Sequence, residues 1–153
     1  MKISGYYIYN NVAITAFSVL AMLRLSSKIP LSKVALLMPI LLDDNIVGKM
    51  INQRPTSFDS VITQNKVYLS NFNNRYDDLL PQVVNAISIL LDLNLVSLYG
   101  EYVISENAGK YESVLSRCDS NRLKNICAVS SKLLKLVKDS DIVNDYRKLN
   151  IEL

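Results

Sequence analysis

Apolar residues near the start of the chain recur every three or four positions, which is the spacing of one buried helix face. They are Val12, Ala16, Val19, Leu20 and Leu23. Asn11 precedes them and is a suitable N-cap, because its side-chain oxygen can accept from free amides of the first turn. The pattern predicts a helix from there to about Ser26. After a break at 26–28, residues 31–42 form a second apolar helix that Pro39 ends or bends.

The middle of the chain keeps the helical spacing but contains more polar residues. Residues 43–54 predict a short amphipathic helix. A turn leads from it into a third, long helix, which we expect to end at Asp77 and Asp78. A fourth helix then spans 79–93, with Pro81 tolerated in its first turn.

The clearest strand signal follows the fourth helix. Two β-prone runs, 95–99 and 102–105, flank a tight turn at Gly100 and Glu101. A helix that leads directly into a small hairpin is the sequence form of a winged helix. The sequence therefore predicts a wing in this region.

The last part of the chain predicts two more helices. Residues 107–110 are expected to form a loop. A helix capped by Ser120 or Asp119 then reaches about Lys138, and a short final helix begins at Asp141.

These elements predict a mainly helical (α+β) fold. Half of the residues are hydrophobic and a fifth are charged, which excludes disorder as the main state. We expect one winged-helix-like domain over 1–153, with five to seven helices and one hairpin. Residues 1–110 would form the helical core and wing, and residues 111–153 a C-terminal helical extension.

The residue types that usually carry catalysis are scarce in this chain. It contains no histidine, so a nucleophile lacks its usual base. Its four glycines are too widely spaced for a phosphate-binding loop. The adjacent acid pairs at 43–44 and 77–78 are better explained as helix caps and solvated residues than as cation ligands. We therefore expect no enzymatic activity, no cofactor and no metal site.

Two further features bear on the cellular compartment. Cys118 and Cys127 are too few for a disulfide framework and wrongly spaced for a zinc knuckle, which favours a reducing, cytoplasmic location. Residues 3–23 carry no charge, but only 12–23 are truly apolar, a length that suits a buried core helix better than a membrane span. A membrane-associated subunit anchored by 3–23 is therefore the weakest of the functional hypotheses.

Positive charge is concentrated in the last third of the chain. Residues 110–153 hold nine Lys and Arg against six Asp and Glu, which equals the whole net charge of +3. Four lysines of the helix expected before Asp139 lie on the side opposite its apolar residues. They are Lys124, Lys132, Lys135 and Lys138. We expect this lysine stripe to bind nucleic acid or an acidic protein surface, and the alternative is a solvated face that maintains solubility.

Tyrosines form a second set of candidate binding residues. They are Tyr6, Tyr7, Tyr9, Tyr99 and Tyr102. Such rings bury a large area while the hydroxyl stays hydrated, so they could anchor a partner protein. The alternative is that they pack at the rim of the protein's own core.

The helix before the hairpin lacks the cations that a DNA-reading winged helix needs for affinity. Its polar residues are Gln82, Asn85, Ser88, Asp92 and Asn94. The turn of the hairpin carries the acidic residue Glu101. We therefore expect this element to dock a protein instead of reading a groove.

The order of these elements resembles the middle component of ABC-three-component conflict systems, which includes the small subunit of Lamassu-type bacterial defence. The similarity lies first in the Asn-led apolar helix NNVAITAFSVLAMLRL and in IPLSKVALLMPILLDDNIVGKM, with its Pro-Leu start and Met38-Pro39 step. The runs AISILLDLNLVSLYGEYVI and SSKLLKLVKDSDIVNDYRKLNIEL extend it over nearly the full length.

This resemblance implies a winged-helix accessory subunit without enzymatic activity. Its partners would be an SMC-like ABC ATPase and an effector nuclease or protease that the complex restrains. Phage or plasmid DNA, sensed by the ATPase, would release the effector, so DNA would be reached through the complex. The alternative from the residues alone is a winged-helix DNA-binding regulator that uses the C-terminal lysine stripe.

Overall fold

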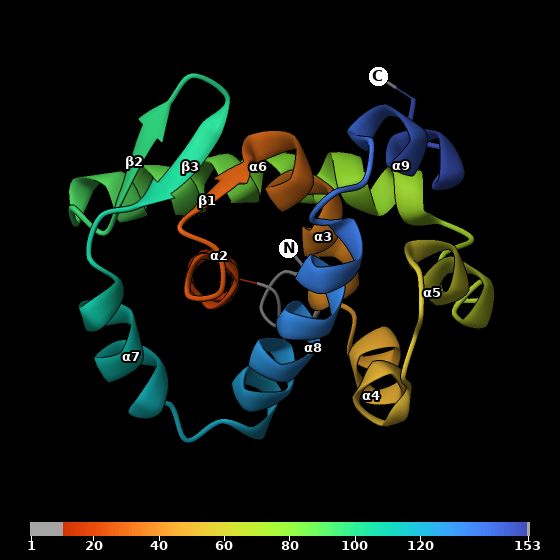
Figure 1. Cartoon of the computed structure of the whole chain (residues 1–153), viewed down its shortest axis with the longest axis horizontal. Helices are drawn as coiled ribbons and strands as arrows, with labels where there is room; N and C mark the ends of the chain where they lie inside the picture. The colour runs from red at the N-terminus through yellow and green to blue at the C-terminus, as the bar shows by residue number, and fades with distance from the viewer. Residues whose placement is uncertain (1–10, 153) are drawn as a thin grey trace, which may run out of the picture.

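The computed structural model describes residues 11–152, which form eight helices and a small antiparallel sheet (Figure 1). The helices are α2 (Val12–Leu23), α3 (Leu31–Leu41), α4 (Asp44–Asn52), α5 (Phe58–Gln64), α6 (Phe72–Asp92), α7 (Ala108–Ser116), α8 (Asn121–Val137) and α9 (Ile142–Lys148). The strands are β1 (Lys28–Pro30), β2 (Val96–Tyr99) and β3 (Tyr102–Ser105). The mainly helical fold with a small hairpin, expected from the sequence, is confirmed.

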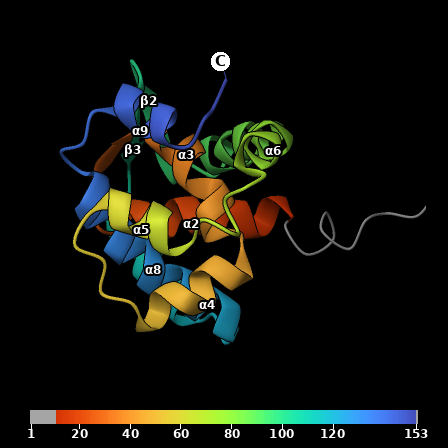
Figure 2. The ribbon, with the colours of Figure 1, turned by 90° about the vertical axis from the view of Figure 1, so that its right-hand side faces the viewer.

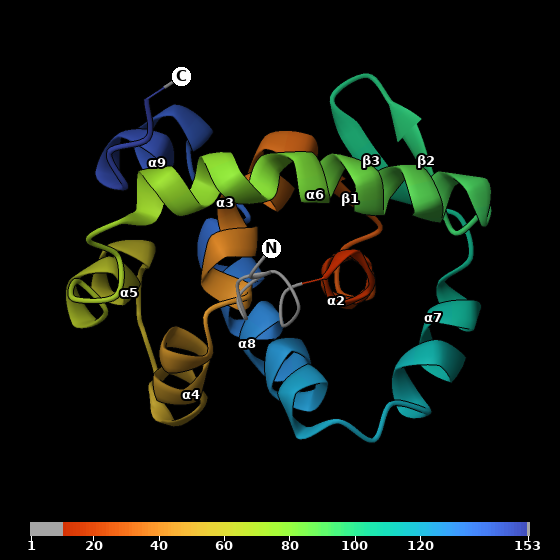
Figure 3. The ribbon, with the colours of Figure 1, turned by 180° about the vertical axis from the view of Figure 1, so that it is seen from behind.

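The two most apolar helices lie in the middle of the molecule. Helix α6 crosses one face and α8 the opposite face, with α2 and α3 between them (Figures 2 and 3). Both α2 and α3 contact α6 and α8. As a result, residues 17–23 of α2 and 33–41 of α3 are all buried. The apolar side chains of these two helices are therefore covered by other parts of the same chain.

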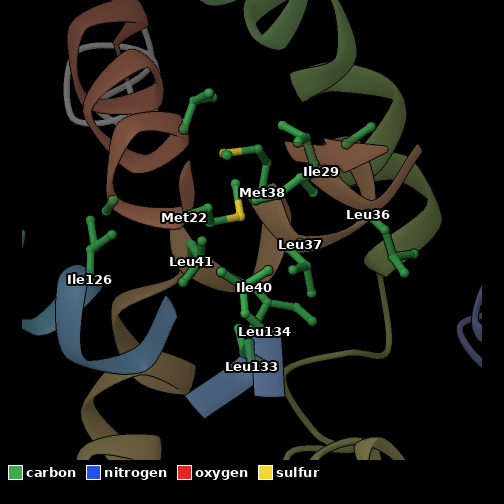
Figure 4. Close-up of a cluster of buried hydrophobic side chains, with 14 of the residues drawn as sticks. Met22, Ile29, Leu36, Leu37, Met38, Ile40, Leu41, Ile126, Leu133 and Leu134 are labelled. Atoms are coloured by element: carbon green, nitrogen blue, oxygen red, sulfur yellow. The ribbon is translucent and has the colours of Figure 1, made fainter. Parts of the chain in front are cut away.

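Helix α3 supplies the centre of the hydrophobic core. Leu37 and its neighbours in this helix are fully buried. Figure 4 shows Met22 of α2, Ile29 of β1 and Ile126 of α8 gathered around α3. The helix continues through Pro39 and ends at Leu41.

The sheet has the strand order β1-β3-β2, and both strand pairs are antiparallel. Gly100 has a φ of +57°, which suits the turn between β2 and β3 because glycine enters this region at no steric cost. Strand β1 was not predicted, since three residues that include Pro30 carry little strand signal. It becomes a strand by pairing with β3, where Ile29 lies opposite Val103.

One predicted helix boundary is wrong. The break falls at 65–71, and Asp77 and Asp78 lie inside α6. Asn65 is the C-cap of α5, where its backbone amide and its buried side-chain amide both donate to the Val61 carbonyl, at 3.1 and 2.8 Å. The acid pair and Pro81 are tolerated within α6 because all three residues are exposed, so water can solvate the carbonyl that Pro81 leaves unpaired.

Residues 108–110, expected to belong to a loop, instead form the start of α7. Tyr111 and Leu115, one helical turn apart, are both buried on this helix. The Tyr111 hydroxyl also donates to the Leu95 carbonyl. Burial of one face of α7 against the core thus stabilises the helix, although the sequence there contains Gly109.

The acid pair at the start of α4 acts as expected for a cap. Asp43 Oδ1 accepts from the amides of Asn45 and Ile46, at 2.9 and 3.2 Å. Asp43 also pairs with Arg75, and Asp44 pairs with Arg122 at 2.9 Å. Within 11–152, no group of three potential ligands gathers in a metal-binding arrangement, and no helix is long and apolar enough to cross a membrane.

Tyr146 of α9 gives the stability of the fold a dependence on pH. Its hydroxyl donates to the Ser32 carbonyl at 2.9 Å and lies 3.1 Å from the Tyr76 hydroxyl, with the two rings edge to face. Burial, together with the hydrogen bond to Tyr76, raises the pKa of Tyr146 above its ordinary value. The unfolded chain loses this proton near about pH 10, whereas the folded chain keeps it. The free energy of unfolding should therefore fall as the pH rises through that region.

Tyr146→Phe should reduce this alkaline decline, because phenylalanine has no proton to lose. Urea unfolding at about pH 8 and about pH 11 measures the decline on both sides of the ordinary tyrosine pKa. Tyr99→Phe, at a tyrosine that is 77% exposed, is the matched control and should leave the decline unchanged. An equal decline in wild type and Tyr146→Phe would contradict the assignment.

Candidate functional site

Helix α8 has the amphipathic character predicted for it. Ile126, Val129, Leu133 and Val137 are completely buried. On its outer side Lys124, Lys135 and Lys138 are exposed, while Lys132 is half-buried at the flank. The structure places the four lysines in three different environments, so they do not form one uniform stripe.

Lys132 is engaged within the protein. Its ammonium donates to the carbonyls of Met50, Ile51 and Gln53, at 2.7, 2.7 and 3.0 Å. These carbonyls belong to the C-terminal end of α4 and the residues after it, which carry the negative end of the helix dipole. Lys132 therefore caps α4 and ties it to α8.

The other three lysines separate along the helix. Lys124, near the start of α8, lies 3.6 Å from the Asp119 carboxylate. Lys135 and Lys138, at its end, line a pocket between α8, β1 and the residues before β1. Lys135 is thus about 16 Å along the helix axis from Lys124, at 1.5 Å per residue.

We call this cavity the basic pocket, and its volume is about 280 Å³. Its lining residues are Leu25, Ser26, Lys28, Ile29, Pro30, Lys33, Ser131, Leu134, Lys135, Val137 and Lys138. Two of its four lysines, Lys28 and Lys33, were not among the sequence candidates. No signal in the local sequence links Lys28 and Lys33 to α8, because they come close to it only through the packing of β1 and α3 against that helix.

Lys33 forms part of the wall of the basic pocket. Its buried ammonium donates to the carbonyls of Val137 and Lys138, the latter at 3.1 Å. It therefore caps the C-terminal end of α8 as Lys132 caps α4. The ammonium groups available to a ligand are those of Lys28, Lys135 and Lys138, which are exposed.

Tyr102 of the hairpin contacts one lining residue of this pocket, Lys28. Lys28 Nζ lies 4.5 Å from the centre of the Tyr102 ring, a cation–π contact. Tyr99 pairs directly with Tyr102 across the hairpin and is 77% exposed. Tyr102 thus lies beside Lys28, which shares the pocket lining with Lys135 and Lys138, and Tyr99 lies opposite Tyr102 in the hairpin. The tyrosines at positions 6, 7 and 9 lie outside the described residues.

Comparison with protein families identifies what kind of subunit carries this pocket. Residues 12–153 match the family model of the ABC-three component (ABC-3C) system Middle Component 3. The chain belongs to this family. It is accordingly an accessory component of a multi-subunit system. Comparisons with curated proteins and with solved structures gave no match.

The face of this middle component that lies opposite the basic pocket differs from it in charge. Between Tyr76 and Leu93, α6 has three aspartates and neither Lys nor Arg. Of the residues expected to face a partner, Asn85, Ser88 and Asp92 are exposed. Gln82 instead donates to Thr15 Oγ1 at 2.7 Å and joins α6 to α2. The exposed side of α6 therefore combines acidic and polar residues with apolar ones, among them Val84 and Ile89.

The two cysteines of the middle component share a small pocket between α2, α7 and α8. Both are free thiols and half-buried. Burial raises the pKa of the Cys127 thiol, and the nearby Arg24 partly opposes this effect. At neutral pH, Cys127 is therefore mainly protonated and a weak nucleophile.

Proposed function

We propose that this middle component bridges an SMC-like ABC ATPase and an effector nuclease or protease in a cytoplasmic antiphage complex of the Lamassu type. In this proposal the subunit catalyses no reaction and acts by holding its partners together. The match to the ABC-3C middle component family over residues 12–153 carries the proposal, since such a component works within a multi-subunit system.

Two surfaces of opposite charge support a bridging role. Helix α8 contributes the basic pocket on one side, and α6 presents Asp77, Asp78 and Asp92 on the other. Exposed apolar residues accompany the acids on α6, among them Val84 and Ile89. A subunit that binds two different proteins needs two such separated surfaces, and their opposite charge would direct each partner to its own side.

The order of elements supports a winged-helix origin for the core. Helix α2, strand β1, helix α3, helix α6 and the β2–β3 hairpin follow one another in the order of a winged helix, with α4 and α5 inserted. In a DNA reader, α6 would enter the major groove. The one cation of α6, Arg75, is half-buried and already pairs with Asp43, which favours protein docking over the alternative of a DNA-binding regulator.

The decisive experiment is assembly from purified components. The ATPase and effector encoded beside this gene are expressed with and without the tagged middle component and analysed by size-exclusion chromatography. We expect a three-protein complex that forms only when the middle component is present. Direct association of ATPase and effector in its absence, with no gain on adding it, would contradict the bridging role.

The regulator alternative is tested with the isolated subunit. Fluorescence anisotropy of a labelled 30-base-pair duplex should show only weak binding, because few free cations are available to neutralise phosphates. Tight, sequence-dependent binding that the Lys135→Glu/Lys138→Glu double variant abolishes would support the regulator instead.

A further inference from the structure

The basic pocket combines positive charge with an apolar lining, and this combination restricts what can occupy it. Its apolar lining residues are Leu25, Ile29, Pro30, Leu134 and Val137. Leu25 is 45% exposed, so part of this apolar surface is open to a ligand. The volume of about 280 Å³ lies just below the range of about 300–1,000 Å³ that is usual for small-molecule sites. The pocket therefore suits one or two side chains better than a cofactor.

The charge of the basic pocket is not compensated within the described part of the chain. Its described lining includes no Asp or Glu. In residues 11–152, none of Lys28, Lys135 and Lys138 forms an ion pair. Three exposed ammonium groups around an apolar depression favour an acidic partner and speed its approach.

The geometry of β1 indicates that side chains must provide the recognition. As the edge strand beside the pocket, β1 could in principle accept an added strand from a partner. However, Pro30 has no amide proton, and the Lys28 carbonyl already accepts from Ser26 Oγ at 2.9 Å. Main-chain pairing along this edge is therefore disfavoured.

Nucleic acid fits the same surface less well. Phosphate-backbone binding draws on a long array of cations, typically about 6–10 contacts. Here Lys132 and Lys33 cap helices, and Lys124 pairs with Asp119. A row of phosphates would also leave the apolar lining of the pocket without a partner.

We propose that the basic pocket binds a short acidic segment of a partner protein, which inserts one apolar side chain among Leu25, Ile29 and Leu134. Flanking Asp or Glu residues of this segment lie against Lys135 and Lys138. The proposal rests on the proposed function, because the partner is a subunit of the same complex. On this proposal, the surface around the C-terminal end of α8 binds a linear peptide segment and not a flat surface of a folded partner.

A peptide probe tests the pocket directly on the full chain. The probe is fluorescein-labelled Glu-Asp-Glu-Leu-Glu-Asp-Glu, titrated by fluorescence anisotropy, and a second probe carries serine in place of leucine. Lys135→Glu/Lys138→Glu should weaken binding by about tenfold or more, since it reverses two contacting charges. Ser131→Leu keeps every charge but fills the pocket, and it should weaken the leucine probe much more than the serine probe.

The matched control is Arg117→Glu/Lys124→Glu, which makes the same change in charge at two exposed residues outside the basic pocket. It should change the affinity by about twofold or less, because exposed charges at that distance are largely screened. Circular dichroism of each variant checks that the fold is kept. If wild type does not bind the leucine probe, or if the control weakens it as much as the pocket variants, the proposal is overturned.

The same variants in the assembly experiment separate this proposal from the bridging role. If the complex forms with wild type but equally well with both pocket variants, the peptide contact is overturned and bridging stands. If wild type binds the leucine probe through the pocket but joins no complex, bridging fails and the pocket assignment stands. If duplex DNA displaces the probe and binds at least as tightly, the pocket is a nucleic-acid site and the proposal is overturned.

Discussion

Replacing Leu37 with alanine is expected to lower the free energy of unfolding by about 2–5 kcal/mol. Leu37 is 0% exposed, and its helix α3 contacts α2, α4, α6, α8, α9 and β1. The cavity left by the lost methyl groups is therefore surrounded by elements that cannot all move in to fill it. The loss is large beside a total stability of about 5–15 kcal/mol for an ordinary domain.

Urea unfolding followed by far-ultraviolet circular dichroism measures this loss as a shift of the midpoint. Leu93→Ala is the matched control, since it makes the same chemical change at a leucine that is 57% exposed. It should cost less than about 1 kcal/mol. Similar losses in the two variants would show that α3 is not the centre of the core.

Lys132→Met is expected to lower the free energy of unfolding by about 1.5–3 kcal/mol, the usual range for hydrogen bonds to a charged group. Methionine keeps most of the apolar stem but has no donor for the three carbonyls of 50–53 that Lys132 caps. The end of α4 would lose its cation, and the link between α4 and α8 would loosen. Hydrogen exchange should show faster opening at the end of α4.

Lys135→Met provides the comparison, one helical turn away on the same helix. Its side chain is exposed, so the change should alter stability by about 0.5 kcal/mol or less. If both variants retain wild-type stability, the ammonium of Lys132 does not hold α4. The comparison also determines how binding data are interpreted, because a defect in a Lys132 variant can arise from a displaced α4.

The parts of the fold that the sequence predicted correctly are those with local signals. Asn11 accepts from the Ile14 amide at 3.0 Å, so the first cap lies within three residues of its partner. Asp141, where the short final helix was expected to begin, likewise caps α9. The hairpin depends on a turn in which Gly100 takes a positive φ. Such signals concern neighbouring residues and do not depend on the rest of the chain.

The parts that were missed depend on residues far apart in the sequence. Strand β1 exists through its pairing with β3, and α7 through the burial of Tyr111 and Leu115. The candidate site shows the same limit. Lys132 lies in the amphipathic pattern of α8 like its neighbours, yet its partner Gln53 is 79 residues away. Periodicity placed the lysines on one face but could not show which of them are already bound.

The unbroken α6 gives the molecule a rigid lever. At 1.5 Å per residue, its 21 residues extend about 32 Å, from α5 and α9 at one end to the hairpin at the other (Figure 3). Glu152, near the end of the described chain, donates its amide to Asn73 in the first turn of this lever. A displacement of the hairpin would therefore tilt the whole of α6 and also move its other end, which lies beside α9. If α6 had broken at Asp77 and Asp78, a hinge would lie between its two ends, and movement at one end would not be transmitted to the other.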